Sequence, residues 1–350
     1  MQSNRPKPLH LLCGRPLVMH VLHALDGIDI ERTVVVVGAE AERVTKKVQE
    51  QAPHWANVTF VEQQSPLGSG DAALTGLTAF EIDDIDDAST VLVLPADRPL
   101  LRPATVMQLV EHHESELNAA TLLTVTLADA EGQRRVVRAG QRKGDNRVVR
   151  ITDEPESDPA PGTIECSTSI FAFRRDLLGP ALRRIRPLDG RSTFPVADVI
   201  ETLASMGYRV GSIETNDAAE VTAVDDRWQL AMAERELRAR TNRSWLLRGV
   251  TMLDPRQTFI DVTVELGRDV TLFPGTMLQG RTAVGDGCEI GPNTRLVDCA
   301  VGARATVQNT VGIEAEIGPD AVVGPFAYLE PGASVGPGER TGPFYTASAE

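Results

Sequence analysis

Among the side chains best suited to chemistry in this sequence is Asp97, a carboxylate at the end of an apolar run. The run Val91 to Leu94 (VLVL) is typical of a buried strand, and Asp97 follows it after two residues. Ligands of open α/β sheets bind beyond the carboxyl ends of the strands, where this carboxylate would stand. Asp97 could equally cap a turn before Pro99, and the residue alone leaves both roles open.

Two further features could bind an anion or a base. The segment from Gln63 to Ala72 (QQSPLGSGDA) joins a predicted strand to a predicted helix, so its backbone amides could hold a nucleobase or phosphate oxygens. Many glycine-rich turns of this kind bind nothing. Lys7 lies with Arg5 beside the same expected cleft, and Arg15 is the other cation near it. A lone lysine in such a place is more often a solvated surface residue.

Histidine and lysine are confined to the front of the chain. All six histidines lie before residue 114, and the last of the four lysines is Lys143. Residues 144–350 therefore contain neither an imidazole nor a lysine ammonium for acid–base catalysis.

Strands and helices alternate along residues 16–126. Apolar runs rich in β-branched residues predict strands at 33–37, 58–61, 91–94 and 122–127. Helical periodicity predicts helices at 16–25, 39–51, 71–80 and 104–116. This alternation predicts a parallel, doubly wound α/β sheet. Farther on, the composition predicts a surface loop at 154–162 (EPESDPAPG), a charged helix at 219–240 and a domain boundary near residue 249.

A six-residue repeat occupies the C-terminal third. An aliphatic residue recurs every six positions at Leu266, Leu272, Leu278, Val284, Ile290 and Leu296 and, after a slip, at Val311, Ile317, Val323, Leu329 and Val335. A period of six fits neither a helix nor an alternating strand. It is typical of a hexapeptide parallel β-helix, in which one aliphatic side chain per face points into a narrow prism. The alternative, a β-sandwich, would show hairpin turns at irregular spacing.

Composition limits the class of protein. A length of 350 residues suits two domains, because single cores stop growing near ~250 to 300 residues. The chain is 42% hydrophobic and 24% charged, which is typical of a folded, soluble protein. Its net charge of −14 disfavours nucleic acid and anionic membranes as partners. Four scattered cysteines and the lack of a long apolar run predict a cytoplasmic protein.

Together these features resemble the sugar-nucleotide pyrophosphorylases, most closely the bifunctional N-acetylglucosamine-1-phosphate uridyltransferase/glucosamine-1-phosphate acetyltransferases of the GlmU type. Residues 1–16 are similar to the second half of the family signature L-A-A-G-x-G-T-R-M-x-S-x-x-P-K-x-L-x-x-x-x-G-x-P. Other matches are Gln63, Gly68 and Ser69 with Q-x-x-x-x-G-T, Asp97 with the aspartate of Y-G-D, and Asp225 with the asparagine of G-V-N-x-R.

The resemblance implies a role for each matched residue. Lys7 and Asp97 would be catalytic, with Lys7 on a phosphate of the nucleotide. The rest of the nucleotide site would be Gln63, Gly68 and Ser69, which contact uracil. Asp97 and Asp225 would hold Mg²⁺, the expected cofactor, and an aspartate in place of the family's asparagine keeps an oxygen ligand.

The sugar contacts depart from the family pattern. Residues 95–96 differ from the family's tyrosine and glycine, and the glycine of G-Y-G-R becomes Arg134. The sugar-reading glutamate becomes Asp153, unless Glu154 takes its role, and the asparagine of E-x-N-T-G becomes Ser167. The expected sugar-binding residues are therefore Arg134, Asp153 and Ser167. Arg134 would either clash with the sugar or reach another group, such as a phosphate or a carboxylate.

Both ends of the chain are expected to be shorter than in the family. Met1 coincides with the methionine of the signature, so the resemblance implies that the first strand and the glycine-rich loop are missing. Their absence would leave unpaired backbone and apolar surface in the centre of the sheet. Residues 324–332 (GPFAYLEPG) are similar to a family stretch G-P-F-A-R-L-R-P-G, and the family's acetyl-transferring residues come later. We therefore expect no acetyltransferase activity.

The expected fold class is α/β, a doubly wound, Rossmann-like nucleotidyltransferase domain followed by a short left-handed parallel β-helix of hexapeptide repeats. The expected division is the nucleotidyltransferase domain at 1–226, a linker helix at 227–248, the β-helix at 249–340 and a tail at 341–350. The resemblance implies a homotrimeric transferase of UDP-N-acetylglucosamine and cell-wall precursor biosynthesis, which joins UTP to N-acetylglucosamine-1-phosphate and releases pyrophosphate. The alternative is a non-catalytic homologue that binds a nucleotide or serves as a trimeric scaffold.

Overall fold

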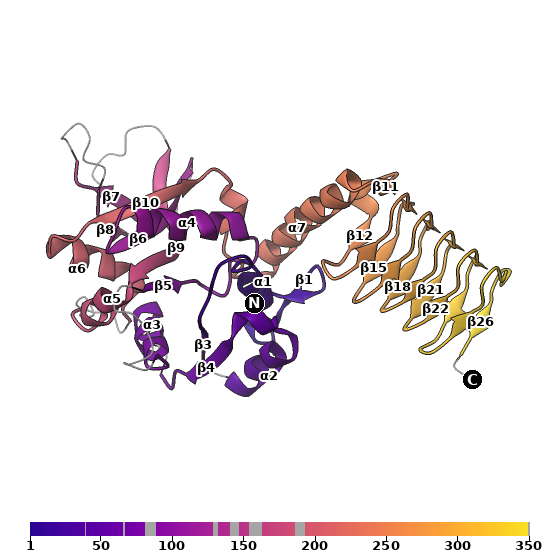
Figure 1. Cartoon of the computed structure of the whole chain (residues 1–350), viewed down its shortest axis with the longest axis horizontal. Helices are drawn as coiled ribbons and strands as arrows, with labels where there is room; N and C mark the ends of the chain where they lie inside the picture. Colours follow the sequence, from indigo (N-terminus) through magenta and orange to yellow (C-terminus); the bar gives the residue numbers. More distant parts are fainter. Residues whose placement is uncertain are drawn as a thin grey trace. The chain divides into compact units, whose positions relative to one another are not determined.

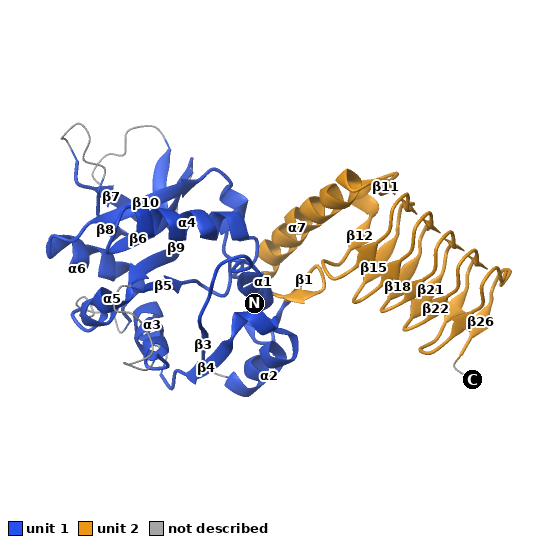
Figure 2. Cartoon of the chain, in the orientation of Figure 1, with its two compact units in different colours: residues 1–10, 17–226 blue, residues 11–16, 227–350 orange. Residues whose placement is uncertain are grey.

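The chain divides into two compact units. The computed structural model describes residues 1–38, 40–65, 67–80, 89–128, 132–140, 147–153, 163–185 and 193–348. The first unit contains Met1–His10 and Leu17–Asp226, and the second contains Leu11–Pro16 and Arg227–Glu350 (Figure 2). The loop expected at 154–162, with Glu154, lies outside the described residues.

The larger sheet of the first unit is mixed rather than parallel. Its strands are β5 (Thr90–Val93), β6 (Ala120–Leu127), β7 (Arg135–Arg138), β8 (Val148–Thr152), β9 (Ile164–Arg174) and β10 (Val210–Thr215). The order is β10-β6-β9-β7-β8, with β5 also paired to β9. β10 runs parallel to β6, but β9 runs antiparallel to β5, β6 and β7. The expectation of a wholly parallel sheet is therefore wrong here, because the antiparallel β7–β8 pair reverses the chain before it enters β9.

A second, two-stranded sheet pairs β3 (Thr33–Val37) in parallel with β4 (Val58–Glu62). Within the described residues β3 pairs only with β4, and β5 only with β9. The apolar side chains at 34–36 and 91–93 are half-buried rather than buried. In the part of the chain that the structure describes, one edge of the β3–β4 pair and one edge of β5 therefore have no paired strand.

Helices cover both faces of the sheets (Figure 1). They are α1 (Leu17–His23), α2 (Ala41–Gln51), α3 (Ser69–Leu77), α4 (Pro103–Ser115), α5 (Arg175–Leu182) and α6 (Val199–Ser205). The first apolar cluster contains residues of α1, α2 and α4 with Leu123 of β6. The second contains residues of α5 and α6, with α3 packed on it, and the adjacent Leu122 of β6. Because neighbouring residues of a strand point to opposite faces, the domain is doubly wound, as predicted.

Helix α7 (Arg227–Leu247) begins later than the predicted helix at 219–240. The earlier residues form the 3₁₀ turn η4 (Ala218–Val221), because the Asp217 side chain accepts the backbone N–H of Ala219 at 3.1 Å and closes a short turn instead. Only Ala233 and Asn242 of α7 are buried. In the described parts of the chain, no helix has both the length and the apolarity that crossing a membrane requires.

The second unit carries a left-handed parallel β-helix of about five coils, as the repeat predicts (Figure 1). One face contains β11 (Thr251–Met252), β14 (Thr271–Leu272), β17 (Glu289–Ile290), β20 (Thr306–Val307) and β23 (Val322–Val323). The next contains β12 (Phe259–Ile260), β15 (Met277–Gln279), β18 (Arg295–Val297), β21 (Val311–Ile313), β24 (Tyr328–Leu329) and β26 (Thr346–Ala347). The third contains β13 (Glu265–Leu266), β16 (Ala283–Val284), β19 (Ala300–Val301), β22 (Glu316–Ile317) and β25 (Ser334–Val335).

The predicted aliphatic residues lie in the interior of the β-helix, where Leu266 of the first coil is half-buried, with the exception of Val311. Val311 is half-buried, and the inward position of its strand belongs to Gly312, which pairs with Leu296 and Leu329. A Cβ at Gly312 would lie 3.1 Å from a methyl of Leu296, so the large neighbours fill the space that a side chain would need. The prediction of an inward Val311 is therefore wrong.

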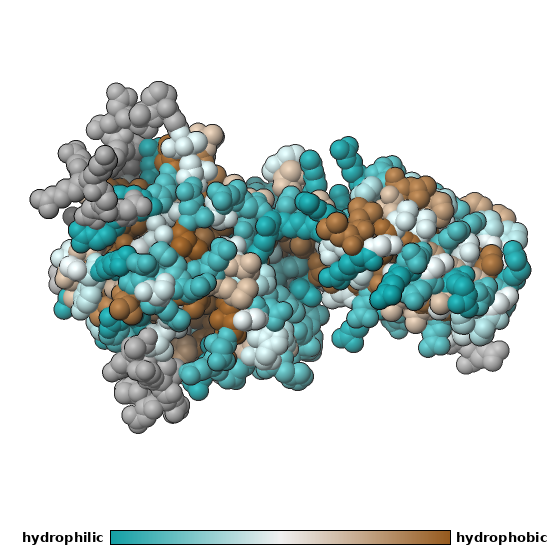
Figure 3. Space-filling model, turned by 45° about the horizontal axis from the view of Figure 1, so that its top comes forward, coloured by the Kyte–Doolittle hydropathy of each residue, from teal (hydrophilic) through white to brown (hydrophobic). Residues whose placement is uncertain are grey.

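The last coil extends into the predicted tail. β26 pairs in parallel with β24, so Thr346 and Ala347 belong to the β-helix rather than to a free end. Apolar side chains are also visible on the surface of this unit (Figure 3). Phe326 and Phe344 are both exposed, and their rings stack at 5.3 Å between centroids.

A small hairpin near the N-terminus also belongs to this unit (Figure 2). Its strands are β1 (Leu11–Leu12) and β2 (Arg15–Pro16), joined by Cys13 and Gly14. Both turn residues have positive φ, +43° and +79°, and a cysteine in this conformation needs support from its surroundings. Glu234 Oε2 of α7 accepts the backbone N–H of Cys13 at 2.7 Å.

Candidate active site

A lysine ammonium forms ion pairs with two carboxylates that are far apart in the sequence. Lys7 lies in the 3₁₀ turn η1 (Lys7–Leu9), and its Nζ donates to Asp97 Oδ2 and to Asp225 Oδ1, each at 2.6 Å. Asp97 follows the end of β5 by four residues, beyond its carboxyl end as the sequence predicts. The structure thus brings together three of the predicted site residues around one cation position.

Backbone hydrogen bonds hold the two carboxylates close together. The N–H of Val224, next to Asp225, donates to the carbonyl of Asp97 at 3.0 Å. Arg98 Nη1 donates to the carbonyl of Val221 in the same segment. The Arg98 side chain is only 13% exposed, and burial lowers the pKa of its guanidinium despite the nearby charges of Asp97 and Asp225. Arg98 therefore places a buried positive charge behind the carboxylates.

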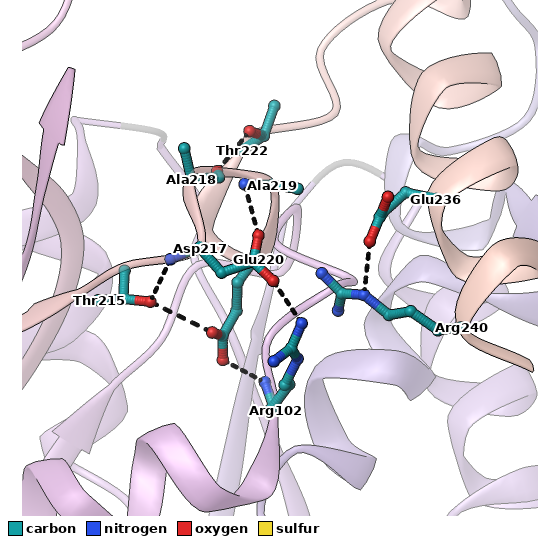
Figure 4. Close-up of polar contacts among 9 residues, drawn as sticks. All are labelled: Arg102, Thr215, Asp217, Ala218, Ala219, Glu220, Thr222, Glu236 and Arg240. Atoms are coloured by element: carbon teal, nitrogen blue, oxygen red, sulfur yellow. Dashed lines mark hydrogen bonds and ion pairs between the residues drawn. The ribbon is translucent and has the colours of Figure 1, made fainter. Parts of the chain in front are cut away.

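A second polar network fixes the turn that precedes Asp225 (Figure 4). Glu220 is 2% exposed and accepts the backbone N–H of Arg102 at 2.8 Å and the Thr215 hydroxyl at 3.3 Å. The Arg102 guanidinium pairs with Asp217. These contacts join the start of α4 to η4. Because η4 lies just before Asp225, they position the second carboxylate relative to the loop that carries Asp97.

The charge state of Lys7 follows from its neighbours. Partial burial alone would lower the pKa of the ammonium, but hydrogen bonds and charges from Asp225 and Asp97 outweigh burial and raise the pKa above its usual value. Lys7 is therefore a protonated point charge at neutral pH rather than a proton acceptor.

The predicted nucleotide turn is built on glycine. Gly68 has φ +107°, a backbone conformation that favours glycine. A Cβ there would also lie 2.8 Å from the carbonyl oxygen of Phe194, so there is no space for a side chain. The N–H of Gly70 donates to that carbonyl at 3.0 Å, and the Ser69 hydroxyl accepts the N–H of Val196 at 3.0 Å. The Gln63 amide donates to Asp71 in the first turn of α3.

The predicted sugar residues form a third group around Arg134. Its Nε donates to Asp153 Oδ1 at 3.0 Å, and its Nη2 donates to Asp198 Oδ1 at 2.9 Å. Its carbonyl accepts the N–H of Ser167 at 2.9 Å. The sequence predicted that Arg134 would clash with the sugar or reach a phosphate or carboxylate, and the carboxylates that it reaches here are the protein's own. Two negative charges surround one positive charge, which disfavours an anion at this point.

One short segment contacts both the nucleotide turn and the sugar group. Phe194 and Val196 bind the turn at 67–70, while Asp198, at the end of η3 (Val196–Asp198), binds Arg134. Sequence reasoning missed Arg98, Asp198 and Glu220. Arg98 could have been found, because it directly follows Asp97. Asp198 and Glu220 were missed because Asp198 binds Arg134, 64 positions away, and Glu220 binds the backbone N–H of Arg102, 118 positions away.

These features define a class of protein. A doubly wound sheet, a glycine turn at the start of a helix and paired carboxylates beyond a strand end are typical of a nucleotide-binding α/β enzyme. Residues 1–186 match the family model described as the MobA-like NTP transferase domain. The chain belongs to this nucleotidyltransferase family, in agreement with the predicted class.

Known relatives extend the likeness into the β-helix. The chain is 41% identical over 317 residues to the bifunctional protein GlmU of Thermobifida fusca, which covers 90% of this chain and 64% of the relative. It is 39% identical over 316 residues to the bifunctional protein GlmU of Mycobacterium ulcerans, covering 89% of this chain and 62% of that protein. The chain thus spans less than two thirds of the length of these relatives, and the predicted resemblance to the GlmU type is confirmed.

A solved structure supports the fold of the first unit. The structure of CMP:2-keto-3-deoxy-manno-octonic acid synthetase complexed with CTP is 20% identical in sequence, with a TM-score of 0.52. It covers 68% of this chain and 94% of its own. At this level of identity, the likeness concerns the fold alone.

Proposed function

We propose that the protein transfers a uridylyl group from UTP to a sugar-1-phosphate, N-acetylglucosamine-1-phosphate by resemblance, giving a UDP-sugar and pyrophosphate. An oxygen of the sugar phosphate attacks the α-phosphorus, and the bond from that phosphorus to the bridging oxygen of pyrophosphate breaks. Such a transfer requires positioning and charge neutralisation rather than a covalent enzyme intermediate. The observation that carries the proposal is that the Lys7 ammonium pairs with the carboxylates of both Asp97 and Asp225.

The two carboxylates suit a magnesium ion. Both lie within 2.6 Å of one ammonium nitrogen, which shows that their oxygens already converge on a cation. Mg²⁺ prefers one or two carboxylates, with phosphate oxygens and waters filling the remaining positions. Asp97 and Asp225 would hold it, and a bound ion would neutralise the charge of the triphosphate. Lys7, which stays protonated, would then pair with a phosphate oxygen.

The remaining predicted residues have assigned roles in this proposal. Gln63, Gly68 and Ser69 read the base through backbone and amide groups at the turn before α3. Arg134, Asp153 and Ser167 lie around the sugar. We further propose that the β-helix assembles the chain into a homotrimer in the cytoplasm. We also propose that this chain transfers no acetyl group, because residues 144–350 have no histidine or lysine to act as the base.

One observation favours the alternative, a non-catalytic nucleotide-binding or scaffold protein. The charged groups of the site already satisfy one another, because Lys7 pairs with both carboxylates and Arg134 pairs with Asp153. A substrate would have to replace these contacts. The alternative therefore predicts nucleotide binding without turnover.

The deciding experiment measures pyrophosphate release from a panel of nucleoside triphosphates and sugar-1-phosphates with MgCl₂. We expect release with UTP and N-acetylglucosamine-1-phosphate, and its loss in Asp97→Ala. Titration calorimetry with UTP is run in parallel. Binding of UTP without release on any pair would reject the catalytic proposal in favour of the alternative. Light scattering tests the trimer independently.

A further inference from the structure

Arg98 carries a buried N–H group that has no hydrogen-bond partner. The side chain is 13% exposed, and its Nη1 donates to the carbonyl of Val221. Its Nε is buried and lacks an acceptor in the part of the chain that the structure describes. Buried N–H groups are nearly always paired in folded proteins, and an unpaired one in a charged group is costly. We therefore expect this donor to find an acceptor in another state of the site.

The Asp97 carboxylate lies beside this donor. Its Oδ1 is 3.9 Å from Arg98 Nε, which is within the range of an ion pair but too far for a hydrogen bond. Its Oδ2 accepts from Lys7 Nζ at 2.6 Å. The two oxygens of one carboxylate thus face two cations, and only the lysine is hydrogen-bonded. A rotation about the Cβ–Cγ bond, a broad torsion in aspartate, that moves Oδ1 by about 1 Å would complete the second hydrogen bond.

The guanidinium and the main chain of Asp97 are both anchored to one segment. Arg98 Nη1 is bonded to Val221, which is 4% exposed, and the carbonyl of Asp97 accepts the N–H of Val224 at 3.0 Å. All of these residues, with Lys7, belong to the first unit. The Asp97 side chain is 27% exposed and is the part that can turn. Arg98 is therefore a fixed donor beside a carboxylate that can rotate toward it.

We propose that Arg98 is a positioning residue for Asp97, to which its Nε–H donates whenever Lys7 leaves this carboxylate for a phosphate of the nucleotide. The inference rests on the proposed function, in which Lys7 pairs with a phosphate oxygen. In the exchange, Oδ1 of Asp97 accepts from Arg98, and Oδ2 stays open toward the place that the ammonium has left. Asp97 thereby keeps one orientation at the moment when it loses its lysine.

Crystal structures of the full chain, wild type and Lys7→Ala, test the exchange directly. Removing the ammonium imitates a lysine that has moved to the substrate, and it requires neither a nucleotide nor a metal ion. In Lys7→Ala we expect the separation between Arg98 Nε and Asp97 Oδ1 to fall from 3.9 Å to about 2.9 Å. An unchanged separation, or an ordered water bonded to Nε in place of Oδ1, would overturn the proposal.

Binding of Mg²⁺ separates positioning from the charge of Arg98. By charge alone, loss of a cation beside Asp97 would strengthen Mg²⁺ binding. Positioning predicts the opposite, because substituting a residue that orients a metal ligand typically costs roughly 10- to 100-fold in affinity. Titration calorimetry with MgCl₂ on the full chain, in the Lys7→Ala background, should therefore show about ten-fold weaker binding when Arg98→Met is added. Equal or tighter binding would overturn the proposal.

Arg32→Met in the same background is the matched control. Arg32 belongs to the first unit, and its Nη1 also donates to a backbone carbonyl, that of Ala79, at 2.7 Å. The control removes the same charge and the same kind of hydrogen bond, and it should leave the Mg²⁺ affinity unchanged. A loss as large as that in Arg98→Met would count against the proposal, and thermal unfolding verifies that both variants fold. If the wild type releases no pyrophosphate, the proposed function fails, and the Lys7→Ala structure still decides whether Arg98 binds Asp97.

Discussion

The backbone carbonyl of Asp97 accepts the N–H of Val224 at 3.0 Å, although the two residues lie in segments more than a hundred positions apart. This bond places Asp225 beside Asp97, so that one ammonium reaches both carboxylates. Because this hydrogen bond joins two backbone groups, substituting the side chain of Asp97 or Asp225 does not remove it. The role of each carboxylate can therefore be tested separately.

The two carboxylates are expected to differ in their tolerance of amides. Asp225→Asn places at this position the asparagine of the family pattern, which keeps an oxygen ligand, and should retain activity within about three-fold. Asp97→Asn removes the carboxylate charge expected to hold Mg²⁺ against the triphosphate and should lose on the order of 100-fold. Initial rates of pyrophosphate release against MgCl₂ concentration measure both. Thermal unfolding serves as the control for folding. Equal losses in the two variants would contradict this assignment of roles.

Arg134 is expected to limit the use of N-acetylglucosamine-1-phosphate. Arg134→Gly removes the ion pair between Arg134 and Asp153. One hydrogen bond from the sugar to the Asp153 carboxylate should then raise kcat/KM for that sugar phosphate by about ten-fold. A panel of sugar-1-phosphates measures the change. In Arg134→Gly with Asp153→Ala, the gain should vanish. A gain that survives the second substitution would show that Asp153 is not the acceptor.

Gly68 is expected to be required by both its conformation and its packing. Gly68→Ala combines a positive φ with a contact of 2.8 Å to the Phe194 carbonyl, and it should destabilise the protein by roughly 1 to 3 kcal/mol. Gly207→Ala is the matched control, because Gly207 has φ +84° but open space around it. Urea unfolding should show a larger loss for Gly68→Ala. Equal losses would mean that the Phe194 contact adds nothing.

His113 is expected to make the protein acid-sensitive. Burial, with smaller contributions from the charges of Arg174 and His112, lowers the pKa of His113 to about 4. In the unfolded chain the His113 imidazole has a pKa near 6.5 and binds a proton more readily than in the folded protein. The free energy of unfolding therefore has its full value above pH 6.5 and falls by up to about 3 kcal/mol as the pH drops toward 4. Urea unfolding of His113→Gln should show a shallower dependence over that range. His112→Gln, on the same helix, should stay close to the wild type, because the charge of His112 makes only a small contribution to the pKa of His113.

The repeat in the sequence predicted the β-helix because each coil buries the same kind of residue at the same interval. The prediction fails where the interval changes. Phe259 pairs with Met277, eighteen positions on, but Leu296 pairs with Gly312, sixteen positions on. A shorter coil shifts the inward position from Val311 to Gly312, and a strict count of six cannot register the deletion.

The site was only partly predictable for a similar reason. Asp97 follows a strand and Gly68 opens a helix, so local pattern places both beyond strand ends. The support for Asp225 comes from Arg98 and from the buried Glu220, whose partners are distant in sequence. The hairpin at 11–16 gave no signal either. Its Cys13–Gly14 turn lacks the usual asparagine, and Glu234 takes over the stabilising role.

The contact between Cys13 and Glu234 has a consequence for the order in which the protein is made. The two residues are separated by 221 positions, and ribosomes add about 5 to 20 residues per second. The hairpin tip therefore emerges roughly 10 to 40 seconds before the carboxylate that supports its strained turn. During synthesis the backbone N–H of Cys13 therefore remains without this acceptor until α7 has been made, and the hairpin at 11–16 completes its contacts only once the chain has entered the second unit.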